Sequence, residues 1–315
     1  MIVGLVDAPA APLQIAREVD PDAIGSLEPI ETSRWRWPVV LAAVLTVLMV
    51  GSLVRELFGD GLVALSRRIP TNPLFYVALG LLYLSPSGFD WLIFRKLWRI
   101  PADGFAALLK KRIANDVVIG YSGEAYFYAW ARARLKMVTA PFGTVKDVSI
   151  LSAVAGNAIT LAMLGLALPF ALELLTPGQS RTVIGSAAVT LAISLPFVLF
   201  SKRVFSLPKR TLEWVFAVHC LRLTVGSTLI LLAWHFAMPD VSIRMLLLLA
   251  AARLLVSRLP LVPNKDLLFA NFTILLIGRG EALSGLMALT AALTLLAHIG
   301  VLAALELSAI IGRRK

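Results

Sequence analysis

Two stretches of this sequence place charged and amide side chains beside strongly apolar runs, and they are the candidates for chemistry. The first is residues 111–136, KRIANDVVIGYSGEAYFYAWARARLK, and the second is residues 253–279, RLLVSRLPLVPNKDLLFANFTILLIGR. Arginine binds phosphate through two parallel hydrogen bonds, and lysine binds it as a point charge. The basic residues therefore suit a phosphate, and the acidic residues can position those cations or bind a basic head group.

The candidate binding residues come from these stretches and from the segment between them. Charged side chains near membrane depth are expensive and are usually paired or functional. For each of them, the alternative is an interfacial charge whose side chain extends to water. The predicted substrate-binding set is Asn115, Glu124, Arg132, Arg134, Asn157, Arg258, Lys265, Asp266, Asn271 and Arg279.

A helix break is predicted in the first stretch at Gly120–Gly123. The second short helix would begin near Ser122 and Glu124, where free N–H groups suit an anion. Irregular backbone at membrane depth must be buried by protein or solvated by a cavity, which favours a re-entrant hairpin. An interfacial amphipathic helix is the alternative.

A second break is predicted at Pro260 and Pro263, because proline ends or kinks a helix. The apolar run that follows, residues 267–278, is roughly 18 Å long as a helix, about half a membrane. Broken segments at corresponding places in two halves are typical of an inverted-repeat carrier with its site at the repeat interface.

The elements that position these residues are predicted to be membrane-spanning helices. Hydrophobic residues make up 58% of the 315-residue chain, and the mean hydropathy is +0.83, which excludes a water-soluble domain. Seven spans are predicted at residues 37–58, 74–94, 148–172, 182–200, 213–237, 243–256 with their flanks, and 282–305. The predicted fold is an all-α integral membrane protein of about seven to eight transmembrane helices, with one or two broken or re-entrant helix pairs.

The distribution of Lys and Arg predicts the orientation, because these residues collect in cytoplasmic loops. Basic clusters precede the first span, follow the second, separate the fourth from the fifth and end the chain, with Arg67 and Arg68 as the exception. Both termini are then cytoplasmic, which requires an even number of crossings and hence one element beyond the seven spans. We expect a cytoplasmic tail over residues 1–36, a transmembrane domain over 37–310 and a basic cytoplasmic end over 311–315, in a bacterial inner membrane.

Several classes of function are disfavoured by the motifs that the sequence lacks. There is no Walker A pattern, Rossmann glycine fingerprint or GxSxG element, so ATP-driven pumping is not expected. His219, His235 and His298 are far apart, so no metal or other cofactor is expected; packing is their default role, with a proton relay at His219 or His298 as the alternative. The net charge is +11, and the basic residues lie at the ends of the predicted spans without aromatic residues among them on which bases could stack. This favours anionic lipid over nucleic acid as the partner.

A family resemblance is carried by the order of four segments. Asn115 is followed by GYSGEAYFYAWAR, then VKDVSILSAVAGNAIT, then RLPLVPNKDLLFANFTILLIG, and finally the span EALSGLMALTAALTLLAHIG. This order resembles the flippase-like transmembrane region of lysylphosphatidylglycerol synthases and their stand-alone relatives, and implies movement of a polar-headed lipid between leaflets. The chain departs from the family at residues 264–266, where a glycine-rich turn would be expected. It ends without the aminoacyl-transferase domain, so we do not expect it to make lysyl-lipid.

The expected function is therefore that of a flippase or transporter for an anionic phospholipid or a lipid-linked intermediate. The sequence allows a homo-oligomer. Two alternatives stay open: an intramembrane enzyme acting on a lipid or polyprenyl phosphate with Glu124 or Asp266 as general base, and a non-transporting membrane subunit. Such an enzyme usually needs a larger polar loop or paired carboxylates for its second substrate. The longest polar interval after residue 36 is the short stretch 95–116, so a non-enzymatic role is preferred.

Overall fold

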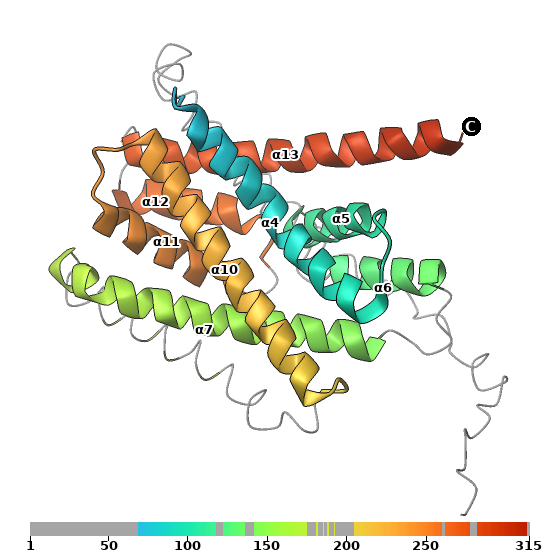
Figure 1. Ribbon diagram of the computed structural model, residues 1–315. Helices are drawn as coiled ribbons and strands as arrows, with labels where there is room; N and C mark the ends of the chain where they lie inside the picture. The colour runs from blue at the N-terminus through green and yellow to red at the C-terminus, as the bar shows by residue number, and fades with distance from the viewer. Residues whose placement is uncertain are drawn as a thin grey trace, which may run out of the picture. The chain divides into compact units, whose positions relative to one another are not determined.

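A computed structural model describes residues 69–117, 122–135, 142–174, 205–259, 262–277 and 282–313, with the single positions 181, 185, 188 and 192. Every regular element in these residues is an α-helix, and eight helices are present (Figure 1). This confirms the predicted all-α class. The predicted tail, the span at 37–58, most of the span at 182–200 and the last two residues lie outside the described residues.

Four of the helices are long and apolar enough to cross a membrane. They are α4 (Pro73–Trp98), α7 (Phe142–Leu174), α10 (Lys209–Ala237) and α13 (Ala282–Arg313). Each contains one of the predicted spans, and their most apolar windows have mean hydropathies of 1.4 to 2.1. The shortest, α4, has 26 residues, or about 39 Å, which exceeds a hydrocarbon core of roughly 30 Å. These helices identify a membrane protein, while the total of seven to eight spans stays a prediction.

The remaining four helices are short and flank the two predicted breaks. Helix α5 (Gly104–Val117) is followed by α6 (Ser122–Leu135), and α11 (Ile243–Ser257) is followed by α12 (Lys265–Ile277). Helix α11 has 15 residues and α12 has 13, or about 22 and 20 Å, so neither spans a bilayer core alone. The predicted span at 243–256 is therefore a short helix in the structure.

The helices pack through two large apolar clusters and a small one, which joins α7 to α11 through Leu164, Ala167 and Ala251. The first joins α4, α10, α11, α12 and α13 around Phe75, Trp234 and Phe269. The second joins α4, α5, α6, α7 and α10, with Phe94 and Phe127 at its centre. Helices α4 and α10 run alongside each other and contribute to both clusters (Figure 1). Burial of these side chains fixes the short helices against the long ones, which positions the polar residues between the clusters.

Candidate functional site

A cavity of about 910 Å³ lies between the helices, and all eight contribute to its wall. Its lining contains six basic and four acidic side chains, so its net charge is +2 with the histidines neutral. The basic residues are Lys111, Arg112, Arg222, Arg253, Arg258 and Lys265, and the acidic ones are Asp90, Asp116, Glu124 and Asp266. Such a set costs free energy to bury unless its members are paired.

Asp90 is the centre of the most enclosed charge cluster. Its carboxylate lies 2.8 Å from Lys111 Nζ and 2.9 Å from Arg222 Nη1. Lys111 also lies 3.5 Å from Glu124, and Arg222 donates to Ser152 Oγ at 2.8 Å. Burial alone would lower the pKa of Lys111, but the carboxylates of Asp90 and Glu124 outweigh burial and raise it. The cluster thus keeps Lys111 protonated and ties α4, α5, α6 and α10 together.

Asp116 is the centre of a second cluster at the end of α5. Its carboxylate lies 3.4 Å from Arg112 Nε and 3.3 Å from His298 Nε2. The other ring nitrogen of His298 shares a hydrogen bond with the Tyr83 hydroxyl at 3.1 Å. Arg112 also donates to the Tyr83 carbonyl and lies over the Tyr83 ring. His298 is therefore a hydrogen-bonded residue. Its two ring nitrogens connect Tyr83 of α4 and Asp116 of α5 to α13.

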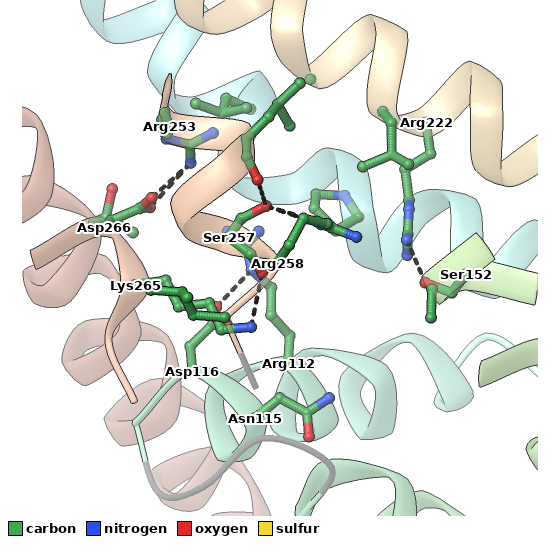
Figure 2. Close-up of a pocket in the computed structure, with 18 of the residues that line it drawn as sticks. Arg112, Asn115, Asp116, Ser152, Arg222, Arg253, Ser257, Arg258, Lys265 and Asp266 are labelled. Atoms are coloured by element: carbon green, nitrogen blue, oxygen red, sulfur yellow. Dashed lines mark hydrogen bonds and ion pairs between the residues drawn. The ribbon is translucent and has the colours of Figure 1, made fainter. Parts of the chain in front are cut away.

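A third cluster surrounds the break between α11 and α12. Arg253 and Asp266 point toward each other, with Nη2 and Oδ1 2.8 Å apart (Figure 2). Lys265 Nζ donates to the Ser257 carbonyl at 2.8 Å. Burial first, and then the nearby Arg258 guanidinium, lower the pKa of Lys265. The guanidinium of Arg258 lies against Gly156 of α7, where a methyl group would overlap it.

The two helix breaks meet. The amide of Asn264, immediately before α12, donates to the Asp116 carbonyl near the end of α5 at 2.6 Å. Asn264 has φ 47°, a left-handed conformation that glycine adopts most easily and asparagine next. This conformation accounts for an asparagine at this turn.

The break between α5 and α6 is held by a close backbone approach. The amide of Gly123 donates to Asn115 Oδ1, and Ser122 Oγ donates to the Ala114 carbonyl, both at 2.8 Å. A Cβ at Gly123 would overlap the backbone carbonyl of Lys111, so only glycine allows α6 to approach α5 this closely. Through this contact the first turn of α6 brings Glu124 to the cavity.

Some buried polar atoms in the cavity wall lack hydrogen-bond partners within the described residues. Oε2 of Glu124 is one of them, and the ring of His219, which is 1% exposed, has only the Val148 backbone as a distant partner in the described part of the chain. Buried polar atoms are normally satisfied by protein, water or ligand. These positions therefore have hydrogen-bonding capacity for a molecule in the cavity. Among the described residues no group of His, Cys, Asp and Glu side chains is placed to hold a metal ion.

The structure brings together six of the ten predicted binding residues. Asn115, Glu124, Asn157, Arg258, Lys265 and Asp266 line the cavity. Arg132 is exposed on α6 and is not part of the lining, and Asn271 donates to the Leu267 carbonyl within α12. Arg279 and the side chain of Arg134 lie outside the described part of the chain.

Several cavity residues were not in the predicted set. Asp90 is the single charge in the predicted span at 74–94, and Arg222 is the only charge in the span at 213–237 beyond its first residue, Glu213. Charges inside a span are a signal that could have identified both. Lys111 and Arg112 were assigned to a basic cytoplasmic cluster, whereas both side chains line the cavity.

No protein-family model matches the chain, and no characterised protein or solved structure does either. What the cavity does is therefore inferred from its own residues.

Proposed function

We propose that this chain binds the phosphate-bearing head group of an anionic membrane lipid in the cavity and moves the lipid between leaflets of a bacterial inner membrane, with both chain termini in the cytoplasm. The observation that carries the proposal is the net charge of +2 in a cavity enclosed by helices of membrane-spanning length. Cations in a low-dielectric site attract an anion more strongly than they would in water. A lipid phosphate supplies that anion from the surrounding bilayer.

The third cluster is the strongest candidate for the phosphate contact. Lys265 donates to a backbone carbonyl and its pKa is lowered by burial and by Arg258. Two neighbouring cations at one break are stabilised by a shared anion, because its charge offsets both desolvation and their mutual repulsion. Arg258 suits bidentate phosphate recognition and Lys265 a single strong contact.

The rival enzymatic interpretation depends on Glu124 or Asp266 acting as a general base. Asp266 lies 2.8 Å from Arg253, and Glu124 lies 3.5 Å from Lys111. Both carboxylates therefore serve as partners for cations, and this arrangement favours binding over proton abstraction.

The test is leaflet translocation of labelled anionic phospholipid in proteoliposomes without ATP, with Arg258→Gln and Arg132→Gln as a matched pair. Arg258 lines the cavity, while Arg132 is an exposed arginine on α6. We expect the wild type and Arg132→Gln to accelerate translocation equally and Arg258→Gln to lose most of the acceleration. No acceleration by the wild type across several anionic head groups would overturn the proposal and favour the enzyme or the subunit.

A further inference from the structure

A second cavity, of about 380 Å³, lies between α4 and α13. It shares the side chains of Arg112, Arg253 and Asp266 with the larger cavity. The two cavities therefore have a common charged wall. The larger cavity is lined by many polar groups. The smaller cavity is lined mainly by α4 and α13, two helices of membrane-spanning length.

The rest of the smaller cavity is mostly apolar and includes small residues, with hydroxyl groups only from Tyr76, Tyr83 and Thr294. Leu79, Gly80 and Leu84 line it from α4, and Leu293 and Ala297 line it from α13. Leu84 is 45% exposed and Gly80 is also exposed. Because both helices are candidate spans, this opening faces the hydrocarbon of the bilayer. The smaller cavity is thus a largely apolar groove whose wall also carries Arg112, Arg253 and Asp266.

We propose that the groove holds one acyl chain of the lipid whose phosphate occupies the larger cavity. This inference rests on the proposed function and names its substrate more closely, as a glycerophospholipid bound by head and chain together. The occupant follows from the shared wall, since a molecule that fits both cavities must join an anion covalently to a hydrocarbon. A free phosphate would leave the apolar groove empty. An apolar helix of another protein would fill the groove but offer no anion to Arg112 and Arg253.

Gly80 offers a direct way to fill the groove. A Cβ added at Gly80 meets no atom within 4 Å, and the same is true at Gly88 on the same helix. Gly88 lines neither cavity. Gly80→Leu therefore adds a side chain to the groove from a position where its Cβ meets no protein atom. Gly88→Leu is a matched control with the same gain in helix propensity.

The experiment measures binding of dioleoyl phosphatidylglycerol and of soluble glycerol 3-phosphate to the purified full chain in detergent. A leucine at position 80 excludes about two methylene groups of the acyl chain, so we expect Gly80→Leu to weaken phosphatidylglycerol binding about tenfold. Glycerol 3-phosphate binding should not change. Gly88→Leu should leave both unchanged, and Arg253→Gln should weaken both.

The outcomes separate this inference from the proposed function. Phosphatidylglycerol that binds the wild type and Gly80→Leu equally overturns the groove and leaves the head-group site standing. Equal weakening by Gly80→Leu and Gly88→Leu also overturns it, because the effect is then not specific to the groove. A wild type that binds neither probe overturns both proposals. If only the phospholipid binds measurably, weaker binding by Gly80→Leu than by Gly88→Leu still supports the groove, and equal binding by the two variants overturns it.

Discussion

Replacing Asp90 with asparagine removes the carboxylate that two nearly buried cations share. The side chains of Asp90 and Lys111 are each 10% exposed and that of Arg222 is 15% exposed. Breaking a buried ion pair by removing one partner costs about 3 to 5 kcal/mol. Lys111 keeps Glu124 at 3.5 Å and Arg222 keeps Ser152 at 2.8 Å. We therefore expect Asp90→Asn to lower the free energy of unfolding by about 3 kcal/mol, the lower end of that range.

The assay is equilibrium unfolding of the purified protein in mixed micelles with increasing dodecyl sulfate. Glu306→Gln is the control, because Glu306 lies 2.7 Å from Lys110 but is 56% exposed, and exposed pairs contribute about 0 to 1 kcal/mol. Arg222→Gln should cost less in the Asp90→Asn background than in the wild type, since the two residues are directly coupled. The reasoning is refuted if Asp90→Asn destabilises no more than Glu306→Gln does.

Three further predictions concern the helix breaks and their cations. Gly123→Ala should destabilise the fold by about 1 to 3 kcal/mol in the same unfolding assay, because its Cβ overlaps the Lys111 backbone; unchanged stability would contradict the close α5–α6 approach. Gly156→Ala overlaps only the flexible end of Arg258, so it should reduce lipid translocation as Arg258→Gln does while the unfolding midpoint barely moves. Anion binding should weaken as pH rises through the lowered pKa of Lys265, because Lys265 of the free protein then loses the proton that it must carry in the complex. Binding by Lys265→Arg, titrated over the same range, should stay flat, and an identical decline in both proteins would exclude Lys265 as the cause.

The long helices could be predicted because hydrophobicity and length alone determine them. The predicted spans at 74–94, 148–172, 213–237 and 282–305 each lie inside a helix of membrane-spanning length. A break was also predicted at Pro263 from the local backbone geometry of proline, and α11 ends at Ser257 and α12 begins at Lys265 on either side of it. Gly120 and Pro260 lie outside the described residues. The capped ends of α4 were not predicted, although Asn72 accepts from the Leu74 amide and Arg99 adopts φ 52°.

The site was predicted only in part, because ion pairing joins residues that are far apart in sequence. Asp90 and Arg222 are separated by 132 positions, so each can be recognised as a charge inside a span, but the sequence does not show that they pair with each other. Lys111 and Arg112 follow Lys110 in a basic run that reads as a topology signal. The packing of α5 against α4 and α13 is what distinguishes Lys110, which pairs with the exposed Glu306, from Lys111 and Arg112 in the cavity.

Asp116 connects the parts of the molecule that would move in the proposed carrier. Its carbonyl accepts from Asn264 at the other break, and its carboxylate is contacted by Arg112 of α5 and His298 of α13. If the cavity opens where the two breaks meet, the hydrogen bond between Asn264 and Asp116 must break, at a net cost of about 1 kcal/mol. A phosphate that draws Arg112 toward itself would compete with the Asp116 carboxylate for that cation. The backbone hydrogen bond between Asn264 and the Asp116 carbonyl does not involve Arg112, so the contact between the two breaks would persist when the phosphate binds.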